Sequence, residues 1–228
     1  MKYSNEIVVA GKVVGVCMEE MPDGPDLRFV VETVSGLPDI LSQVVCIYPA
    51  MPGADIPQLE KGMWVKAKGT LRMDTWKNGK PRTYAITGEP EIITAEQEKK
   101  MINHIFLQGC LDEPIEPVYK IEGIKGSYTV YAKDALSKEI YCYYCAVPED
   151  KAFDIGELEN LKGPVITVGS VWVWHDFDTL ASMPVIVMKR LDIDEYAAMS
   201  ELTDWMIERG AHGIIGLSDE GHLSVEEF

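Results

Sequence analysis

The stretch Gly69–Ala85, GTLRMDTWKNGKPRTYA, predicts two strands joined by a tight turn. Asn78-Gly79 supplies the turn, because both residue types tolerate positive φ and stand between two strand-like runs. The hairpin also gathers flat rings and positive charge, in Arg72, Trp76, Lys77, Lys80, Arg82 and Tyr84. Rings that stack bases beside cations that neutralise phosphates are the chemistry of a groove for single-stranded nucleic acid. The alternative interpretation is an exposed hairpin whose two rings pack into the core.

The positive charge of this hairpin is local. The chain of 228 residues has a net charge of −16. Residues 1–100 carry 12 basic against 14 acidic side chains, whereas residues 101–228 carry 9 against 23. Between Lys61 and Arg82 there are seven cations, which include Lys66 and Lys68, and one anion, Asp74. Because phosphate binding is largely electrostatic, this basic part of the first half is the candidate for nucleic-acid binding.

The bulk composition is that of a globular protein, with 46% hydrophobic and 25% charged residues. No apolar run approaches the roughly 18 residues of a membrane-spanning helix. The opening residues, MKYSNEIVVAG, lack the pattern of a signal peptide, so we expect a cytoplasmic protein. Five cysteines, an odd number in a chain of this size, argue against a disulfide framework.

The sequence contains an internal repeat. The pattern Asn5-x-Ile-x-x-x-Gly11 recurs 98 residues later as Asn103-x-Ile-x-x-x-Gly109. Further pairs follow in the same order at offsets of 99 to 101: Arg28–Val34 with Ser127–Lys133, Val45–Pro49 with Tyr144–Pro148, Leu59–Gly62 with Leu161–Gly163, and Gly69 with Gly169. This ordered set predicts two copies of one domain, residues 1–95 and 103–193.

Both copies have the pattern of an all-β domain. The expected strands are Glu6–Val16, Leu27–Val34, Ser42–Tyr48, Trp64–Met73 and Arg82–Ile93 in the first copy, and His104–Asp112, Ser127–Lys133, Glu139–Val147, Val165–Trp174 and Pro184–Leu191 in the second. A short helix is expected near Gly53–Lys61 and near Lys151–Leu161, and a loop at Glu19–Asp26. Short strands with glycine bends predict two small closed five-stranded barrels.

The remaining segments join or follow the copies. Thr94–Met101 is a short polar linker with room for one helical turn. Residues 194–228 are expected to form a C-terminal helix and an acidic tail. Apolar residues recur at helical spacing over Asp194–Arg209, and Gly210 is a plausible stop. The chain ends in Ser224-Val-Glu226-Glu227-Phe228.

The first copy resembles the bacterial and phage family of single-stranded DNA-binding proteins, which has the OB-fold. The resemblance covers about 90 residues and rests on Asn5-x-Ile-x-x-x-Gly11, on Leu59-Glu-Lys61-Gly62 followed by Gly69-Thr-Leu-Arg72, and on Trp76, Gly79 and Arg82-Thr-Tyr84. Some members have two OB domains per chain, which fits the repeat. Many end in an acidic tip that closes with Phe and docks replication and repair enzymes. Here Glu226, Glu227 and Phe228 are similar, without the proline often found before the last residue.

The family resemblance implies where DNA binds. Trp76 lies in the loop between strands four and five, and Tyr84 on strand five stacks a base, while Arg72, Lys77, Lys80 and Arg82 follow the phosphates. Phe29 and Tyr48 are further candidates, although on alternating strands one of them should face the core. In the second copy the equivalent hairpin keeps Trp172, Trp174 and Phe177, but Asp176 and Asp178 replace its cations. Trp174 is therefore a weaker candidate, and a structural or partner-binding role is expected for the second copy.

Other chemistry finds little support in the sequence. Cys142-Tyr-Tyr-Cys145 resembles half of a zinc site, but no second pair of ligands follows, so no metal and no cofactor are expected. On a strand, a spacing of three places the two sulfurs on opposite faces. No nucleophile elbow, P-loop or dinucleotide-binding fingerprint is present, so we expect no enzyme activity.

The sequence thus predicts a non-catalytic protein that binds single-stranded DNA with little sequence preference during replication, recombination or repair. A homodimer is the preferred assembly, because two such chains would present four barrels. The alternative is an OB-fold interaction module, such as a mobile-element or phage accessory factor, without strong DNA binding. An acidic mimic of nucleic acid is a third hypothesis.

Overall fold

The structure is a computed structural model that describes residues 5–75, 81–111, 115–117, 121–133, 140–150, 163–176, 181–193, 214–217 and 223–226. Over these residues the fold is all-β, and their one helical element is the 3-10 turn η1 (Glu96–Glu98) in the predicted linker. The described part of the chain holds no helix with the length and hydropathy that crossing a bilayer requires. The prediction of an all-β protein is confirmed.

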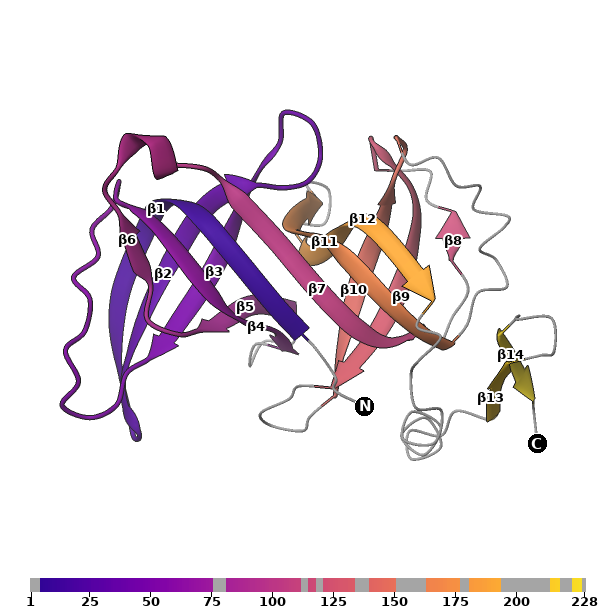
Figure 1. The fold of residues 1–228 in the computed structure, drawn as a ribbon, viewed down its shortest axis with the longest axis horizontal. Coiled ribbons are helices and arrows are strands. Elements are labelled where there is room, and N and C mark those ends of the chain that lie inside the picture. The colour runs from indigo at the N-terminus through magenta and orange to yellow at the C-terminus, as the bar shows by residue number, and fades with distance from the viewer. Residues whose placement is uncertain are drawn as a thin grey trace. The chain divides into compact units, whose positions relative to one another are not determined.

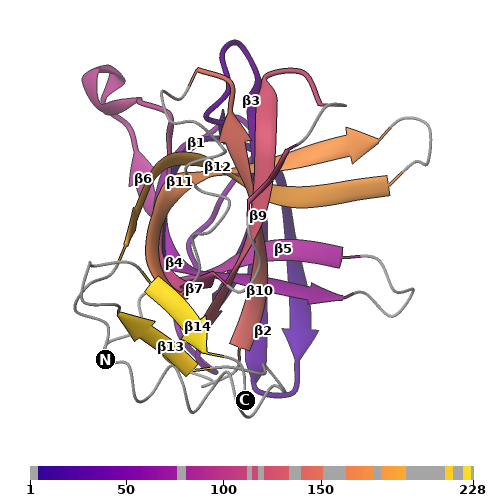
Figure 2. The same ribbon diagram turned by 90° about the vertical axis from the view of Figure 1, so that its right-hand side faces the viewer.

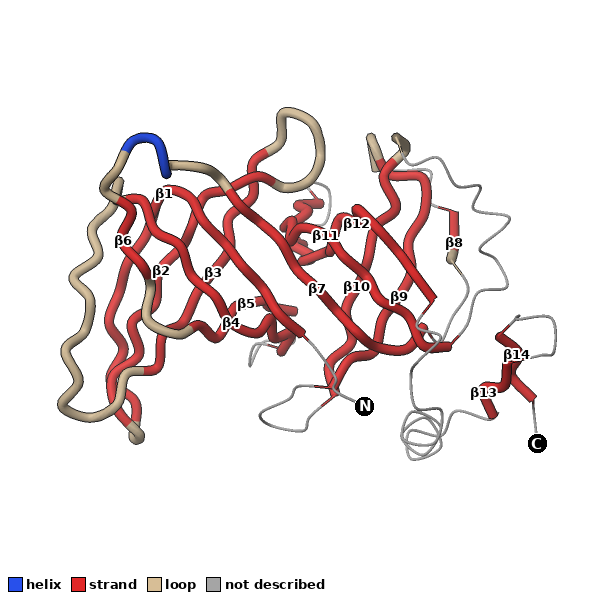
Figure 3. The backbone as a smooth tube through the Cα atoms, in the orientation of Figure 1, coloured by secondary structure: helices blue, strands red, loops and turns tan. Residues whose placement is uncertain are grey.

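The strands of the first copy are β1 (Asn5–Met21), β2 (Gly24–Val34), β3 (Leu41–Pro49), β4 (Trp64–Thr75), β5 (Pro81–Thr87) and β6 (Glu91–Ile93). The later strands are β7 (Ile102–Leu111), β8 (Glu116–Pro117), β9 (Ile124–Lys133), β10 (Ile140–Pro148), β11 (Gly163–Asp176), β12 (Ala181–Ile193), β13 (Ile214–Leu217) and β14 (Leu223–Glu226). Figure 3 shows them in red. All ten strands expected from the sequence are present, although the last strand of the first copy is split into β5 and β6.

Strands β1 to β5 close into a ring (Figure 1). The first half of β1 pairs with β4 and its second half pairs with β2, both antiparallel. Strand β3 pairs with β2 on one side and, in parallel, with β5 on the other, and β5 pairs with β4. Because β1 serves both neighbours, the ring has no free edge at that point, which is how small barrels remove exposed strand edges.

Gly11 explains how β1 can change partners. A Cβ at this position would lie 2.0 Å from the carbonyl oxygen of Glu32, so only glycine allows β1 and β2 to approach this closely. Lys12 is the residue at which the pairing passes from β4 to β2, and a register shift follows between Val13 and Gly15. The glycine therefore marks a bend of the strand, as its position in the sequence predicted.

A buried asparagine fastens the start of β1 to β4. Asn5 Nδ2 donates to the carbonyl oxygen of Leu71 over 2.6 Å, and the Leu71 N–H donates to Asn5 Oδ1 over 3.1 Å. The amide side chain thus imitates a backbone partner, and both of its polar atoms are satisfied. Asn103 makes the same pair of bonds with Val171, at 2.6 and 2.9 Å. The repeated Asn-x-Ile pattern is therefore a repeated structural device.

The cores of the two copies match at a second place. Phe29 of β2 pairs with Cys46 of β3, and Tyr128 of β9 pairs with Cys145 of β10. All four residues are buried. Strand neighbours also follow a common order, β1-β2-β3-β5-β4 in the first copy and β7-β9-β10-β12-β11 in the second. Sequence repeat and structural repeat therefore coincide at these residues.

By compactness, the described residues fall into two units. One contains residues 5–106 and 169–187, and the other contains residues 107–168 and those from 188 onward. These limits pass through β7, β11 and β12. The domain limits of 1–95 and 103–193 stay a prediction.

Several sequence expectations need correction or fall outside the described residues. Residues 53–61 are an irregular loop and not a helix, since Gly53 takes a φ of +81° and no helical hydrogen-bond ladder forms. The expected loop at 19–26 is a continuation of β1 and β2, joined by a turn at Pro22 and Asp23. The helices expected at 151–161 and 194–209 lie outside the described residues. Part of the expected acidic tail, Leu223–Glu226, forms β14 and pairs with β13.

Candidate nucleic-acid interface

Strands β4 and β5 form the predicted hairpin and extend together from the ring (Figure 2). Their pairing runs from Gly69 opposite Thr87 to Thr75 opposite Pro81. Side chains alternate along it, so that Leu71 and Ala85 are buried in the core. The opposite, outer face carries Arg72, which lies directly across from Tyr84. The structure therefore brings together a cation and an aromatic ring that the sequence predicted for one site.

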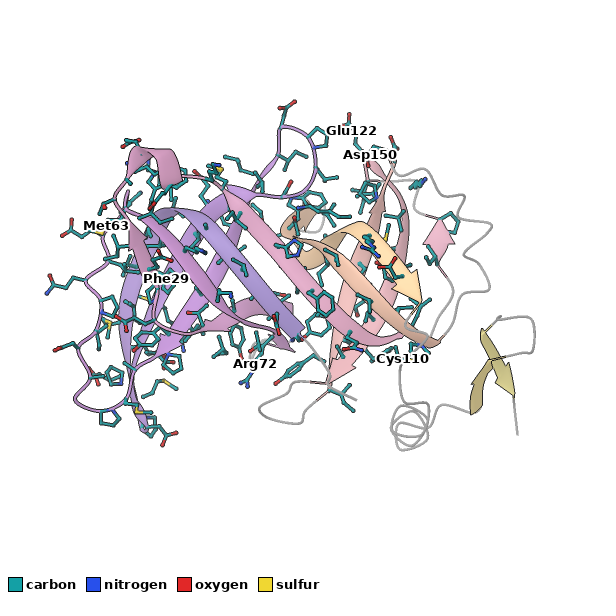
Figure 4. All side chains as sticks on the ribbon, in the orientation of Figure 1. Phe29, Met63, Arg72, Cys110, Glu122 and Asp150 are labelled. Atoms are coloured by element: carbon teal, nitrogen blue, oxygen red, sulfur yellow. The ribbon has the colours of Figure 1, made fainter. Side chains whose placement is uncertain are left out.

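Arg72 and Tyr84 are both half-buried. Each of the two residues therefore keeps part of its surface accessible to solvent. Figure 4 shows Arg72 at the side of the ring formed by β4 and β5. Such a pair can offer one base a stacking surface and one phosphate a charged hydrogen-bond donor.

Two further cations lie on the same outer face of β4. Lys66 and Lys68 precede Arg72 by six and four residues, so all three side chains point to the same face. They alternate with the buried Val65 and Ala67, which point to the core. Lys68 is exposed, and the Lys66 ammonium lies 4.0 Å from a carboxylate oxygen of Glu91. An exposed ion pair at this distance contributes little, so Lys66 remains available to a competing phosphate. Lys66, Lys68 and Arg72 thus form what we call the β4 cation row.

Next to this row, the outer face of β3 and β5 is apolar. Val45 is 37% exposed and Ile86 is half-buried, while Ile47, which pairs with Ile86, is buried at 7% exposure. Val45 in turn pairs with Val30 of β2. This apolar floor, Val45, Ile47 and Ile86, was not predicted from the sequence, because aromatic and charged residues alone were taken as candidates for the site. Strict alternation with the buried Cys46 would have placed Val45 and Ile47 on the outer face.

Phe29 and Tyr48 are corrections to the predicted site. Phe29 is only 1% exposed, and it lies inside the ring of strands (Figure 4), so its ring belongs to the core and cannot stack a base. Tyr48 pairs with Leu27, which is also buried, and therefore lies on the core-facing side of β3. It is half-buried because it stands near the end of that strand. Alternation along the strands predicted that one of Phe29 and Tyr48 would face the core, and in the structure both do.

A further cation on the outer face, Arg28 of β2, is already neutralised. Its Nη1 lies 2.6 Å from Glu19 Oε2, and its Nη2 lies 3.6 Å from Asp26 Oδ2. These acids belong to the projecting end of the β1–β2 pair, residues 16–28, which we call the β1–β2 arm. The arm carries four acidic residues against this one arginine. It is therefore a poor surface for phosphate.

Several predicted residues are outside the description. Trp76, Lys77 and Lys80 lie in the undescribed 76–80 segment, as do Glu227 and Phe228 at the end of the chain. Arg82, Trp174 and Glu226 have described backbone positions on β5, β11 and β14, but their side chains are not described. The proximity of Trp76 to Tyr84 stays a prediction.

The cysteines behave as packing residues. Cys142 and Cys145 lie on β10, the first half-buried and the second buried, so the sulfurs face opposite sides as expected. Burial raises the pKa of the Cys46 and Cys145 thiols, which stay neutral and unreactive at physiological pH. Burial also raises the pKa of Tyr128, whose hydroxyl lies 3.3 Å from Thr167 Oγ1. Within the described part of the chain, no three side chains gather as metal ligands.

Comparison with solved structures identifies the fold. The chain is similar to a deletion mutant of the single-stranded DNA binding protein from Thermus aquaticus, with a TM-score of 0.62, 16% identity, and 84% of this chain and 94% of that chain covered. The wild-type protein from Thermus aquaticus gives a TM-score of 0.60 at 14% identity, with 86% and 96% covered. No family model and no curated protein matches the sequence. The chain thus has the OB-fold of a single-stranded DNA-binding protein, and the sequence resemblance is confirmed at the level of fold.

Proposed function

We propose that this protein binds single-stranded DNA, without catalysis and with little sequence preference, on the outer face of β4 and β5. The observation that carries this proposal is Arg72 opposite Tyr84, at the end of the β4 cation row, on a fold shared with a single-stranded DNA binding protein. The OB-fold binds strands across its face, between the loops that join strands one and two and strands four and five. The pair lies next to the second of these loops.

Each part of the face has a distinct role. The Tyr84 ring stacks one base, which contributes about 1–3 kcal/mol and tolerates any base because every base has a π face. The apolar floor around Val45 and Ile86 excludes water from neighbouring bases. The β4 cation row neutralises phosphates, which makes binding sensitive to salt. We infer that Trp76, Lys77, Lys80 and Arg82 extend the same surface.

The finer features of the family arrangement are also part of the proposal. The repeated asparagine device and the common strand order support two tandem OB barrels. We propose that the first barrel is the main DNA-binding unit, because the second hairpin has aspartates where the first has cations. We infer a homodimer, a role in replication, recombination or repair, and docking of partner enzymes on Glu226, Glu227 and Phe228.

A matched pair of tyrosines tests the proposed face. Binding of fluorescein-labelled oligo(dT) is measured by anisotropy at low salt for the wild type, Tyr84→Leu and Tyr48→Leu. Both rings are half-buried, but only Tyr84 is on the outer face. We expect Tyr84→Leu to raise the Kd by about 5- to 100-fold, which corresponds to one lost stacking contact. Tyr48→Leu should leave the Kd within about twofold.

Two results would contradict this proposal. The first is a wild-type protein that leaves oligo(dT) anisotropy and its own tryptophan fluorescence unchanged at low salt. The second is an equal loss of affinity in the two tyrosine variants, which would indicate a general effect on stability. A urea titration of each variant separates stability from binding.

A further inference from the structure

We propose that Trp64 at the start of β4, with Lys12 across from it on β1, is a second site where a base of single-stranded DNA stacks, so that one DNA strand runs along the β4 cation row from Tyr84 to Trp64. This inference rests on the proposed function, and it adds the path of the strand and the residues at its far end. It is carried by the face on which Trp64 lies, by the neighbours of its ring and by a comparison with the second copy.

Trp64 lies on the outer face of the first barrel. The next residue, Val65, is fully buried, and side chains alternate between the two faces along a strand. Trp64 therefore shares its face with the β4 cation row. Its side chain is half-buried, so part of it remains accessible to a ligand. A tryptophan that only filled the core would be expected on the face of Val65.

The neighbours of Trp64 give it a chemistry like that proposed for Tyr84. The register places Trp64 directly across from Lys12 of β1 on one side and from Ile93 of β6 on the other. Ile93 is buried at 8% exposure and offers the ring an apolar support, whereas Lys12 is exposed. Lys12 is also across from Glu32 of β2, but in the part of the chain that the structure describes no ion pair joins them. An aromatic ring beside such an ammonium can stack a base and attract its phosphate.

The second copy shows that the fold itself does not require this row. The same asparagine device fixes β4 at Leu71 and β11 at Val171, so the residues of the two strands correspond at an offset of 100. The positions of Trp64, Lys66, Lys68 and Arg72 are therefore occupied by Pro164, Ile166, Val168 and Trp172. These four positions of β11 carry no cation, and the strand does not start with an aromatic ring. Trp64 thus accompanies the cations of the first copy, which is the copy proposed to bind DNA.

The distance along β4 decides what one DNA strand can reach. Trp64 and Arg72 are eight residues apart, which is about 26 Å at the usual rise of a strand. Figure 4 marks these two ends by Met63, which precedes Trp64, and by Arg72. Stacked nucleotides of one strand follow each other at about 3.4 Å, so (dT)4 spans about 14 Å and (dT)12 about 41 Å. A tetramer therefore contacts one end of the row at a time, and a dodecamer contacts both.

Oligonucleotides of these two lengths test the second stacking site. Anisotropy of fluorescein-labelled (dT)4 and (dT)12 at low salt gives the Kd for the wild type, Trp64→Leu, Trp64→Phe, Lys12→Gln and Tyr84→Leu. Tyr48→Leu is the matched control, because it removes a half-buried ring from the core-facing side of the sheet. A urea titration of each variant measures its stability.

We expect Trp64→Leu to raise the Kd of (dT)12 by about 5- to 100-fold, as for one lost stacking contact. The Kd of (dT)4 should change by about twofold at most, because a tetramer that cannot bridge the two ends still binds at Tyr84. Trp64→Phe keeps an aromatic ring and should bind (dT)12 nearly as the wild type does, but with less quenching of tryptophan fluorescence. Lys12→Gln should lower the slope of log K for (dT)12 against log salt by about 0.7, as for one lost phosphate contact.

The outcomes separate this inference from the proposed function. A wild type that binds neither oligonucleotide would overturn both. A loss of affinity in Tyr84→Leu, with wild-type affinity for (dT)12 in Trp64→Leu and Lys12→Gln, would overturn only the second site. An equal loss for both lengths in Trp64→Leu, with a lower free energy of unfolding, would mean that the ring only stabilises the barrel. A mass in sedimentation that rises with concentration for the wild type but not for Trp64→Leu would place the ring in an interface between two copies.

Discussion

The β1–β2 arm and the β4–β5 hairpin are both two-stranded extensions of one ring, but their chemistry is opposite. The arm, residues 16–28, carries four acids and one arginine, whereas residues 61–82 carry seven cations and one acid. The arm exposes methionines, and the hairpin carries Tyr84 opposite Arg72. In an OB-fold these two extensions flank the binding face. DNA is therefore expected to follow the hairpin side of that face and to avoid the arm.

Two arginines show why residue type alone does not define a binding site. Arg28 and Arg72 both lie on the outer face of the ring, on β2 and β4. Arg28 is engaged by Glu19 and Asp26, so a phosphate would have to displace a carboxylate to reach it. Arg72 lies opposite a tyrosine in the register. Arg28 is thus a structural cation in the arm, and the ligand-binding role proposed for Arg72 rests on its place across from Tyr84 on the outer face.

The largest expected effect concerns the root of the hairpin. A Cβ on Gly69 would lie 1.8 Å from the carbonyl oxygen of Ile86, so Gly69→Ala must push β4 and β5 apart. We expect a loss of about 3 kcal/mol or more in the free energy of unfolding, as for other severe steric changes. Urea titration measures it. The arm should keep its pairing, because none of its hydrogen-bonded partners lies on β5.

Gly88→Ala is the matched control for Gly69→Ala. Gly88 follows the same hairpin, but no atom lies within 4 Å of the position of its Cβ and its φ is not positive. Its substitution should change the unfolding free energy by less than about 0.5 kcal/mol. A similar cost for both variants would show that the close approach at Gly69 does not hold the hairpin in place.

The next effect separates the two extensions by charge. In Lys66→Gln/Lys68→Gln/Arg72→Gln, the slope of log K for oligo(dT) against log salt should become smaller by about 2, since each phosphate contact on a single strand contributes about 0.7. The Kd at low salt should rise by about 10- to 100-fold for three lost contacts. Glu20→Gln/Asp23→Asn in the arm should leave the slope unchanged. An equal change of slope in the arm variant would remove the distinction between the two extensions.

A smaller effect concerns the strand between arm and hairpin. Cys46 of β3 pairs with Phe29 of β2 on one side and Ala85 of β5 on the other. Burial raises the pKa of its thiol, so the folded state keeps the proton, while the unfolded thiol ionises near a pKa of about 8.5. Below the unfolded pKa the thiol is protonated in both states, so its contribution to stability is complete. As the pH rises above that pKa, ionisation favours the unfolded state and the free energy of unfolding falls.

The consequence can be measured by urea titration between pH 7.5 and 9.5. Each such thiol lowers the unfolding free energy by up to about 1.4 kcal/mol per pH unit above the unfolded pKa. Cys46→Ala should flatten this decline, at the expense of some packing. Cys17→Ala is the control, because Cys17 is exposed. An unchanged decline in Cys46→Ala would assign it to other groups, such as Cys145 and Tyr128, whose pKa values are also raised.

The strands of the repeat could be predicted because each is encoded locally. Alternation of apolar residues specified β2 and β3, and the repeated Asn-x-Ile-x-x-x-Gly pattern located β1 and β7. The prediction of a helix at 53–61 was wrong. No local pattern shows that the chain entering this loop is held to the arm, where the Ala50 N–H donates to the carbonyl oxygen of Pro25. The length of the arm was also not predicted. The turn-forming residues at 22–25 indicated a loop over 19–26, whereas β1 continues to Met21 and β2 begins at Gly24.

The site was predicted less completely than the fold. The pairing of Arg72 with Tyr84 was not predicted, because a two-residue turn at Asn78-Gly79 pairs Lys77 with Lys80 and would place Arg72 opposite Ala85. The observed register differs from this by one residue. The burial of Phe29 and the orientation of Tyr48 required knowledge of which face of each strand meets the core. The neutralisation of Arg28 could not be seen at all, because Glu19 and Asp26 reach it only when β1 and β2 pair through the arm.

The smallest expected effect tests that neutralisation directly. Glu19→Gln/Asp26→Asn would release Arg28 toward the outer face, where it lies opposite Ile47 of β3. We expect oligo(dT) affinity to rise about two- to threefold and the salt slope to increase by about 0.7, as for one new phosphate contact. Glu20→Gln/Asp23→Asn removes the same charge without touching Arg28 and should raise affinity less, with no change of slope. Equal gains from the two variants would mean that the total charge of the arm, and not the release of one arginine, governs how DNA approaches this side of the barrel.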